Sequence, residues 1–432
     1  MRAMKDSGVP WLKEIPVDWK VERGKNVLAL QKRPVRENDE VVTCFRDGEV
    51  ILRSLRRTEG FTMSDKEIGY QGINEGDIVI HGMDGFAGAM GVSKSTGKGS
   101  PVLIVCTPKY DAIPQYIIYY LRALAMTDVF VALATGIRER SCDLRWNKVS
   151  ELEFIMPSSS EQQKIVEFLD RKCAEVDEMI ALQEQIIEEL KAYKQSVITE
   201  IATKGLKPAA PMRDSGIEWI GSIPEHWEMT PFRSYVVMRG EKNKGEKTRE
   251  LLALSFALGV TLYRDKVFNM DRVKENYEDY QLVYENDLVL SPNDIIKGSV
   301  YVSKYYGCIS PMYLVFSARN KNTHYLPYLS YLLRTKEAGR KFFYIARGLI
   351  GDILDNGKYV TRRMSVSKQD LMSFKVLLPP ITEQKAIADY LDEKCADIDS
   401  LIQTKQSKID SLKEYKKSII YEYVTGKREV TE

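Results

Sequence analysis

EQQKIVEFLDRKCAEVDEMI at residues 161–180 decides the fold, because it returns as EQKAIADYLDEKCADIDSLI at residues 383–402. In both copies the apolar residues recur at steps of three, four or seven, which is the pattern of a coiled-coil helix. One such helix cannot hide its apolar seam alone, so two near-identical ones in a chain are expected to pair. Because each follows its own globular head, we expect the pairing to be antiparallel.

The two predicted helices are long and have identifiable ends and seams. A helix of about 40 residues is roughly 60 Å long. Pro157 and Pro379 precede the helices, Ser160 and Thr382 are the expected N-caps, and Gly205 ends the first. The expected pairing residues are Ile165, Leu169, Val176, Met179, Ile186, Leu190 and Tyr193, then Ile387, Leu391, Ile398, Leu401, Leu412 and Tyr415. Four polar seam residues either fix the register or extend only their aliphatic stems along it: Lys172, Gln183, Lys394 and Lys405.

The repeat extends into the segments before each helix. Residues 6–19 return as residues 214–227, with Asp-Ser-Gly and two tryptophans in register, and EGDIV at 75–79 returns as ENDLV at 285–289. Elsewhere these segments differ far more between copies than the helices do. We interpret the helices as a shared structural part, and we interpret the two heads as parts that differ in the targets they contact.

The heads have the pattern of a mixed fold. Short apolar runs at 77–80, 102–105 and 312–316 are bounded by turn-forming residues and predict strands. Residues 116–124 and 328–333 predict short helices, each beginning near a proline. The fold class is therefore α+β, with two β-rich heads joined by two antiparallel coiled-coil helices in a pseudo-twofold repeat. The predicted parts are a first head (1–157), a first helix (158–205), a second head (206–379, with a linker at 206–211), a second helix (380–426) and a tail (427–432).

The composition is that of a globular protein, with 44% hydrophobic and 29% charged residues. No apolar run approaches the roughly 20 residues that cross a bilayer, and the charged start lacks a signal-peptide stretch, so we expect a cytoplasmic protein without membrane contact. The net charge of +2 does not by itself indicate a nucleic-acid partner. Six cysteines without a CxxC pair and three separated histidines indicate buried reduced thiols and no metal site.

The doubled plan of head and helix resembles the specificity subunits of Type I restriction-modification systems. The residues that carry the resemblance are Pro157 with Glu161-Gln162, Pro379-Pro380 with Glu383-Gln384, the opening segment Asp6-Ser7-Gly8 to Trp19 with its repeat, and Gly76-Asp77-Ile78. The resemblance covers the whole chain. It departs from the pattern at Ser158, where the second copy has Pro380, and at Asn286, which replaces Gly76.

This resemblance implies that each head reads one half of a split, asymmetric target in double-stranded DNA. It implies that the helices set the gap and dock two methyltransferase subunits, and that restriction/translocase subunits join the complex. The chain itself would then be no enzyme and bind no cofactor: S-adenosylmethionine would bind the methyltransferase subunits, and ATP and Mg the restriction subunits. Half-sites about 34–36 Å apart suit proteins with approximate twofold symmetry.

Arginine, asparagine and glutamine read bases, while lysine and arginine also bind phosphates. In the first head the DNA-binding candidates are Arg46, Arg53, Arg56, Arg57, Arg138, Arg140 and Arg145. In the second head they are Lys242, Lys244, Lys247, Arg249, Arg347, Arg362 and Arg363, of which the last three are expected in the place of Arg138 and Arg145. Lys94 and Lys304 are matched between heads and are expected to contact phosphates. For any one of these residues a solvated surface charge is the alternative.

Other motifs have simpler interpretations. The matched positions of Trp11, Trp19, Trp219 and Trp227 indicate packing rather than base stacking. The glycines at 82, 85, 88 and 91 lack a Walker lysine pattern, so we expect a flexible recognition loop there. Two further functions stay open, a coiled-coil adaptor that never binds DNA and a DNA methyltransferase or nuclease. The second has little support, because the nearest catalytic string, SPND at 291–294, has one proline and no aromatic residue.

Overall fold

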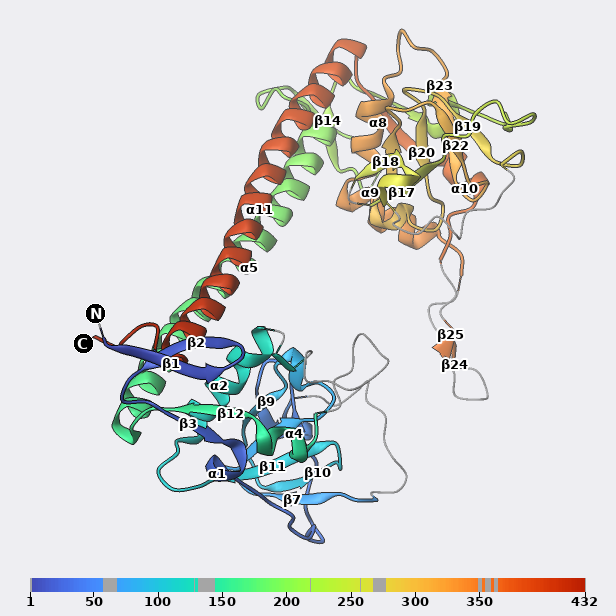
Figure 1. The fold of residues 1–432 in the computed structure, drawn as a ribbon. Coiled ribbons are helices and arrows are strands. Elements are labelled where there is room, and N and C mark those ends of the chain that lie inside the picture. Colours follow the sequence, from blue (N-terminus) through green and yellow to red (C-terminus); the bar gives the residue numbers. More distant parts are fainter. Residues whose placement is uncertain are drawn as a thin grey trace. The chain divides into compact units, whose positions relative to one another are not determined.

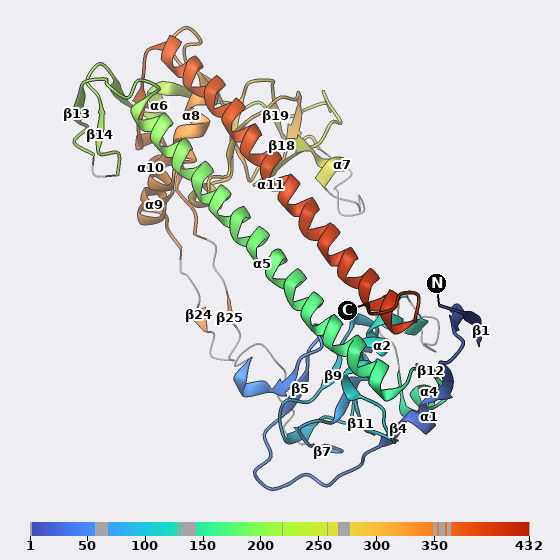
Figure 2. The same ribbon diagram turned by 90° about the vertical axis from the view of Figure 1, so that its left-hand side faces the viewer.

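The chain divides into two compact units, one around each head (Figures 1 and 2). A computed structural model describes residues 2–56, 68–127, 129–130, 144–217, 219–256, 258–266, 277–348 and 364–431, with the backbone of 352–353 and 359–360. The first unit holds residues 1–184 and 406–432, and the second holds residues 185–405. Each unit therefore combines one head with a part of both long helices.

The first head is built from short antiparallel strands around a four-stranded sheet of order β4-β11-β8-β9. Helix α2 packs on β9 of that sheet. The elements are β1 (Met4–Val9), β2 (Leu12–Pro16), β3 (Lys20–Arg23), α1 (Gly24–Val27), β4 (Leu28–Leu30), β5 (Val42–Cys44), β6 (Val50–Leu52), η1 (Arg53–Leu55), β7 (Gln71–Ile73), β8 (Ile78–His81), η2 (Gly85–Ala87), β9 (Met90–Val92), β10 (Gly97–Gly99), β11 (Leu103–Pro108), α2 (Pro114–Met126), α4 (Trp146–Glu151) and β12 (Glu153–Met156).

The second head repeats this plan around the sheet β16-β23-β20-β21. Its elements are β13 (Met212–Asp214), β14 (Ser222–Pro224), β15 (Glu228–Pro231), α6 (Phe232–Tyr235), β16 (Val236–Met238), β17 (Leu252–Ser255), β18 (Gly259–Leu262), α7 (Tyr263–Lys266), β19 (Gln281–Val283), β20 (Leu288–Leu290), η4 (Ile295–Lys297), β21 (Val300–Val302), β22 (Gly307–Ile309), β23 (Leu314–Ala318), α8 (Leu326–Leu333), α9 (Lys336–Ile345), β24 (Asp352–Ile353), β25 (Tyr359–Val360), α10 (Lys368–Ser373) and β26 (Lys375–Leu378).

The two heads share their strand pairing except at β24–β25, a pair described in the second head alone. The pairs β12-β3, β10-β7, β5-β6 and β1-β2 of the first head correspond to β26-β15, β22-β19, β17-β18 and β14-β13 of the second. The central strands are apolar on both faces, because Ile78 and Ile80 of β8 pack in the large core and Val79 packs in a smaller one. In strand β20, Leu288 and Leu290 likewise pack in the large core of the second head, and Val289 packs in its smaller one. The predicted α+β class and internal repeat are confirmed.

The long helices are α5 (Ser159–Lys204) and α11 (Ile381–Val424). The N-cap predictions are wrong by two residues: Ser158 accepts from the N–H of Glu161 and Gln162 at the start of α5, and Pro380 accepts from Gln384 at the start of α11. Ser160 and Thr382 lie inside the first turn, where the backbone is already helical. A serine two residues earlier precedes the same apolar pattern, so spacing alone did not distinguish them.

The buried stripe of both helices steps alternately by four and three residues. Its buried or half-buried members are Leu169, Cys173, Val176, Ile180, Gln183, Ile187, Leu190, Lys194 and Val197 in α5, and Leu391, Cys395, Ile398, Ile402, Lys405, Ile409, Leu412, Lys416 and Ile419 in α11. The seam prediction is wrong at Met179, Tyr193, Leu401 and Tyr415, which are 43–51% exposed. The stripe includes the polar residues Gln183 and Lys194. A seam drawn through the largest apolar residues therefore takes Met179 and Tyr193, each one position before a residue of the stripe.

Several smaller predictions have clear outcomes. Cys44, Cys106, Cys173, Cys308 and Cys395 are buried free thiols, as expected. The glycines at 82–91 do not form a loose loop, because β8, η2 and β9 make a compact hairpin in which Gly91 lies too close to the Gly48 carbonyl for a Cβ. No helix among the described residues is long and apolar enough to span a membrane.

Candidate nucleic-acid interface and its attachment to the helices

A buried tryptophan joins each head to the helix that follows it. Trp19 Nε1 donates to Glu161 Oε2 of α5 at 2.9 Å, and Trp227 Nε1 donates to Glu383 Oε2 of α11 at the same distance. Both indole rings are fully buried. A hydrogen bond to a charged acceptor contributes about 1.5–3 kcal/mol. The packing role predicted for these two tryptophans is confirmed.

The same tryptophans contact the end of the other helix. Beyond α11, Gly426 has a φ of +71°, and a Cβ there would lie 2.4 Å from Pro16 and 3.1 Å from the Trp19 ring. Beyond α5, Gly205 has a φ of +78°, and a Cβ would lie 3.1 Å from the Trp227 ring. A left-handed φ and a close approach both favour glycine. Within each unit, the head is therefore held by the first turn of one helix and the last turn of the other.

The glutamine after each glutamate binds backbone groups of the head. Gln162 accepts from the N–H of Ile113, just before α2, and donates to the Pro157 carbonyl, at 2.9 and 3.0 Å. Gln384 makes the matching bonds, at 2.8 and 2.7 Å, to the N–H of Tyr325 before α8 and to the carbonyl two residues before α11. The repeated Glu-Gln pair is thus an attachment between head and helix.

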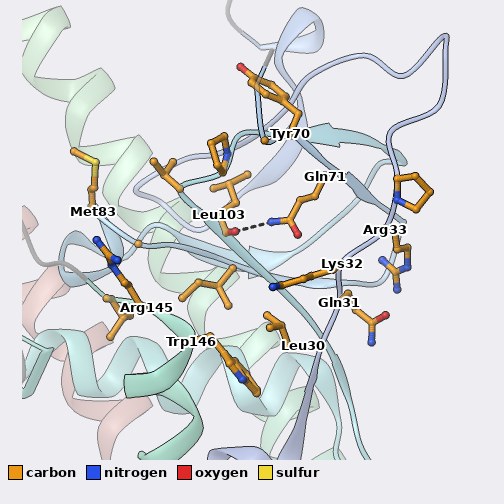
Figure 3. Close-up of a pocket in the computed structure, with 17 residues that line it drawn as sticks. Leu30, Gln31, Lys32, Arg33, Tyr70, Gln71, Met83, Leu103, Arg145 and Trp146 are labelled. Atoms are coloured by element: carbon orange, nitrogen blue, oxygen red, sulfur yellow. Dashed lines mark hydrogen bonds between the residues drawn. The ribbon is translucent and has the colours of Figure 1, made fainter. Parts of the chain in front are cut away.

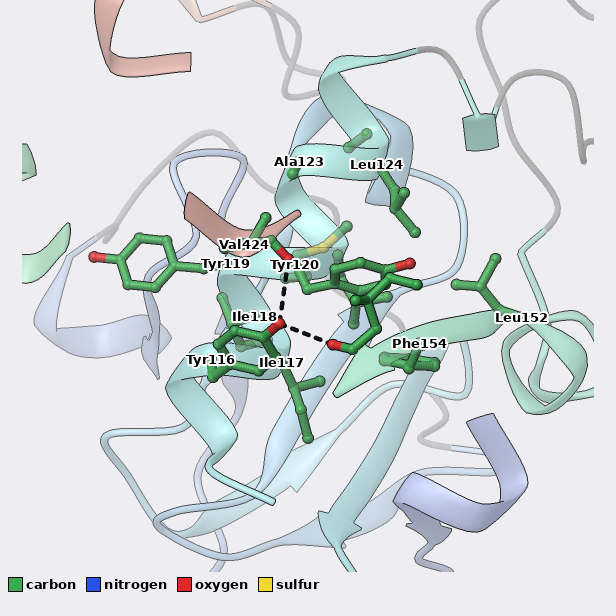
Figure 4. Packing of buried hydrophobic residues seen from close by; sticks show 14 of the residues in the cluster. Tyr116, Ile117, Ile118, Tyr119, Tyr120, Ala123, Leu124, Leu152, Phe154 and Val424 are labelled. Atoms are coloured by element: carbon green, nitrogen blue, oxygen red, sulfur yellow. Dashed lines mark hydrogen bonds between the residues drawn. The ribbon is translucent and has the colours of Figure 1, made fainter. Parts of the chain in front are cut away.

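Two tyrosines on α2 complete the attachment of the first head. Tyr119 donates to Asp170 of α5 at 2.6 Å, and Tyr116 donates to the carbonyls of Ile155 and Val424 at 2.8 and 3.2 Å (Figure 4). Burial and the Asp170 hydrogen bond raise the pKa of Tyr119 far above its usual value, so the phenol stays protonated and donates. The matching bonds in the second unit are Tyr331 to Asp392 at 2.5 Å and Tyr328 to the Ala202 carbonyl at 3.0 Å.

Matched ion pairs show that the helix segments run antiparallel in each unit. In the first unit, Asp177 of α5 accepts from Lys416 of α11 at 2.6 Å, while Phe168, earlier in α5, contacts Tyr423, later in α11. In the second unit, Lys194 pairs with Asp399 at 2.6 Å. The carboxylates are about 60% exposed, so each pair contributes about 0–1 kcal/mol. Their chief effect is on register.

Three of the described basic candidates of the first head are paired with the head's own carboxylates. Arg46 binds Asp84 at 2.8 Å, while Arg56 and Lys94 bind Glu49 at 2.9 and 3.0 Å. Arg53 Nε donates to a threonine hydroxyl at 3.1 Å. To contact DNA, Arg46, Arg56 and Lys94 would exchange an internal partner for phosphate or a base, which lowers the net gain. Their role in DNA binding stays a prediction.

In the second head some of the described basic candidates form ion pairs and others do not. The pairs are Lys242 with Asp279 at 3.5 Å, Lys247 with Glu241 at 2.8 Å, Arg249 with Glu246 at 2.7 Å and Arg347 with Asp370 at 3.7 Å. Lys244 and Lys304 make no ion pair with the described residues. Arg57, Arg138, Arg140, Arg362 and Arg363 lie outside the described residues. The place of Arg145, which precedes α4, is taken by Ser367 before α10, so the expected match of Arg145 with Arg362-Arg363 is wrong.

A cavity of about 880 Å³ in the first head brings together polar groups that the sequence did not indicate (Figure 3). Lys32, Arg33, Gln71 and Trp146 line it, together with the predicted candidate Arg145. Gln71 is held by donating its side-chain amide to the Leu103 carbonyl at 2.7 Å. Guanidinium, amide and aromatic groups are the types that contact bases, so this cavity is the best-formed candidate interface of the first head.

Arg33 is set in place by the Gly-Asp-Ile motif. The buried Asp77 binds both guanidinium nitrogens of Arg33, and the buried Asp287 binds Arg239 Nε at 2.6 Å in the second head. The sequence did not reveal Arg33 and Arg239, because they stand at different distances from strands β4 and β16. The signal was available in the repeated aspartate, which needed a buried partner. Among the described residues no group of His, Cys, Asp or Glu is placed to hold a metal ion.

Comparison with known proteins shows what this chain is similar to. Residues 256–425 match the family model of the Type I restriction modification DNA specificity domain. Two curated proteins of Methanocaldococcus jannaschii named as type I restriction enzyme specificity subunits, MjaX and MjaVIII, are each 24% identical over 96% of this chain and over 94% and 93% of their own length. Over nearly its whole length the chain is therefore similar to Type I restriction enzyme specificity subunits, and residues 256–425 match their DNA specificity domain.

Solved structures share the fold of this chain. A chain from a study of complex assembly and conformational transition of the type I R-M system aligns with a TM-score of 0.67 at 14% identity, covering 96% of this chain and 99% of that one. The HsdS subunit from Thermoanaerobacter tengcongensis aligns with a TM-score of 0.50 at 15% identity, covering 96% and 98%. These two likenesses show that the chain shares its fold with those proteins.

Proposed function

We propose that each head reads one half of a bipartite, asymmetric DNA target and that the paired helices set the gap between the halves. The supporting observation is a contrast within the chain. The tryptophan, glutamine and tyrosine residues that attach each head to the helices repeat in both units, whereas the ion pairs and cavities of the two heads differ. Two domains held alike but surfaced differently suit two unlike half-sites, since identical heads would suit a palindrome.

The exposed apolar residues of the helices support docking of two copies of one partner. Met179 is two positions after Asp177 in α5, and Tyr415 is next to Lys416 in α11, at the level of the ion pair of the first unit. The equivalent residues Leu401 and Tyr193 have the same positions relative to Asp399 and Lys194 in the second unit. Matched surfaces bind matched partners, so these are the proposed sites of two methyltransferase subunits, to which restriction/translocase subunits are added.

The chemistry in this proposal belongs to the partners. The chain itself acts as a non-catalytic subunit that binds no cofactor; S-adenosylmethionine is bound by the methyltransferase subunits, and ATP and Mg by the restriction subunits. The support is the family's role in specificity together with the absence of a catalytic motif in the sequence. Purified chain alone should transfer no methyl group, and methylation by the chain without its partners would contradict this assignment.

A head exchange tests the reading of half-sites. Residues 1–157 are replaced by the first head of another specificity subunit, and methylome sequencing of the host gives the modified motif. One half of the motif should change while the other half and the gap stay fixed. The matched control exchanges residues 206–379 and should alter only the other half. A change in both halves from either exchange would contradict independent reading.

A pair of surface variants tests the docking sites. Replacing Tyr193 and Leu401 by serine should weaken co-purification of the methyltransferase while lowering the melting temperature by only about 2–4 °C per site, because both side chains are about half exposed. Variants at Tyr415 and Met179 should have the same effect at the matched site. Undiminished two-to-one assembly with all four changed would exclude these residues as the docking surface.

A further inference from the structure

A second cavity, about 380 Å³ in volume, lies in the second head and is lined by four cationic side chains. They are Lys297, Arg334, Lys336 and Arg340, which together form what we call the basic pocket. The remaining lining residues are Gln195, Ile296, Gly298, Thr335, Gly339 and Phe343, so no carboxylate takes part. Four positive charges around one cavity repel each other, and an anion bound among them would remove that repulsion.

Local structure explains why the four cations converge. Lys336 and Arg340 are four residues apart on α9 and therefore share one face of the helix. α9 lies close against η4, which ends at Lys297, because Gly339 has no side chain: a Cβ there would stand 2.7 Å from the Ile296 carbonyl. Arg334 is held between α8 and α9, with its guanidinium 4.3 Å from the Tyr301 ring.

None of the four cations has an internal carboxylate partner among the described residues. The basic candidates Arg46, Arg56 and Lys94 of the first head are each ion-paired at 2.8–3.0 Å. By contrast, Lys297, Lys336 and Arg340 are exposed and make no described ion pair. An external anion can therefore bind here without displacing an internal partner, which distinguishes the basic pocket from those candidates.

The described residues of the first head differ from the basic pocket at two matching places. Ala87 ends η2 in the place where Lys297 ends η4. Arg122 occupies the place of Arg334, but Gly48 of the β5–β6 hairpin lies so close that a Cβ would be 2.5 Å from its Nη1. The basic pocket therefore distinguishes the two heads.

We propose that the basic pocket binds a backbone phosphate of duplex DNA and so fixes the position of the second head on its half-site. This rests on the proposed function of the heads as DNA readers. Phosphate contacts position a protein on DNA without reading its sequence. Three of the cations are exposed lysine or arginine side chains around a concave surface, which suits a phosphate on an extended strand. The pocket is thus a positioning site on the second head.

The neighbouring hairpin is the part that such a contact would position. The Arg334 guanidinium packs on the Tyr301 ring. The Tyr301 hydroxyl in turn donates a hydrogen bond at 2.5 Å to the carbonyl of Phe256, in the turn between β17 and β18. Phe256 and Leu258 at this tip are 63% and 67% exposed. Apolar side chains contact thymine methyl groups or insert between base steps. A phosphate in the basic pocket would hold this tip against the duplex through Arg334 and Tyr301.

The salt dependence of DNA binding tests the proposal. The full complex with Lys297→Ala, Lys336→Ala and Arg340→Ala is titrated with a duplex carrying the host's methylated motif at several salt concentrations. Each lost phosphate contact lowers the slope of log K against log salt by about 0.9, so up to three contacts lower it by about 1–3. Leu258→Ala is the matched uncharged control and should leave the slope unchanged. Arg334 is left in place because it packs on Tyr301.

The outcomes separate this inference from the proposed function. If the wild-type complex shows no preference for the motif over an unrelated duplex, the proposed function fails. If the wild type binds specifically and the triple variant keeps the wild-type slope, the phosphate site alone is refuted. An altered methylation motif would mean base contact, and loss of the methyltransferase would mean a protein partner; both overturn the proposal. Should the triple variant melt early, the single variant Lys336→Gln should still lower the slope by about 1.

Discussion

The position of the helix seam can be tested with two leucine-sized side chains three residues apart. Ile398 is 3% exposed and neighbours Asp399, which pairs with Lys194 of the facing helix segment, whereas Leu401 is 50% exposed. Ile398→Ala removes a fully buried side chain and leaves a cavity, which costs about 2–5 kcal/mol. Leu401→Ala removes a side chain that is already half hydrated and leaves no cavity, so the cost is about 1 kcal/mol.

Calorimetric melting of the purified chain measures the difference. For a unit of this size each 1 kcal/mol shifts the melting temperature by about 2–4 °C, so Ile398→Ala should lower the transition of the second unit by roughly 5–15 °C. Leu401→Ala should lower it by about 2–4 °C. Because two compact units can melt separately, hydrogen exchange of α11 peptides identifies the transition that moves. Equal destabilisation by both variants would refute the seam described above.

Three further predictions follow from the attachments and buried groups. Gln384→Ala removes the side-chain amide that donates to the Thr323 and Pro379 carbonyls, while the Tyr325 N–H keeps its second acceptor, the Tyr235 hydroxyl. Thermal unfolding should therefore show a loss of about 2–4 kcal/mol; a loss under about 0.5 kcal/mol would mean that water replaces the amide. Burial raises the pKa of the Cys44 and Cys106 thiols to about 12 and that of the Cys308 thiol to about 11. Site-resolved alkylation at pH 8 should therefore modify these three cysteines only after unfolding, and rapid labelling of the native chain would contradict their burial. Burial lowers the pKa of His81, whose Nδ1 accepts from a backbone N–H at 3.0 Å. The stability that the neutral ring contributes is therefore present above pH 6.5 and is lost as the pH falls through the lowered pKa. His81→Gln should show a weaker fall in melting temperature between pH 7 and 5, and an unchanged profile would exclude this histidine as a cause of that fall.

The sequence predicted the architecture because the internal repeat and the heptad pattern can both be read directly from the order of residues along the chain. The helix ends came within two residues, and α2 and α8 appeared where Pro114 and Pro327 indicated them. The seam could not be read fully, because Met179 and Tyr193 are more apolar than Gln183 and Lys194, which nonetheless lie on the buried stripe. Burial on a helix is set by angular position, so a polar residue can occupy the stripe while an apolar neighbour stays exposed.

The candidate interface was harder to predict than the fold. The cluster of Arg46, Arg53 and Arg56 is prominent in the sequence, yet Arg46 and Arg56 are neutralised by carboxylates of their own head. The basic pocket was missed because Lys297 and Arg340 are 43 positions apart and meet only after η4 and α9 pack. Charge density along a chain does not report which charges already have partners.

The way each head is completed makes the two copies unequal while the protein is being synthesised. The core of the first head includes Ile420 and Val424 at the end of α11, which are made roughly 250 residues after the start of α5. At 5–20 residues per second, a ribosome takes about 12–50 s to supply them. The corresponding residues of the second head, Ile198 and Ala202, already exist before that head is translated. The nascent first head therefore waits with an uncovered aromatic surface, and chaperone binding or aggregation during synthesis should concentrate there.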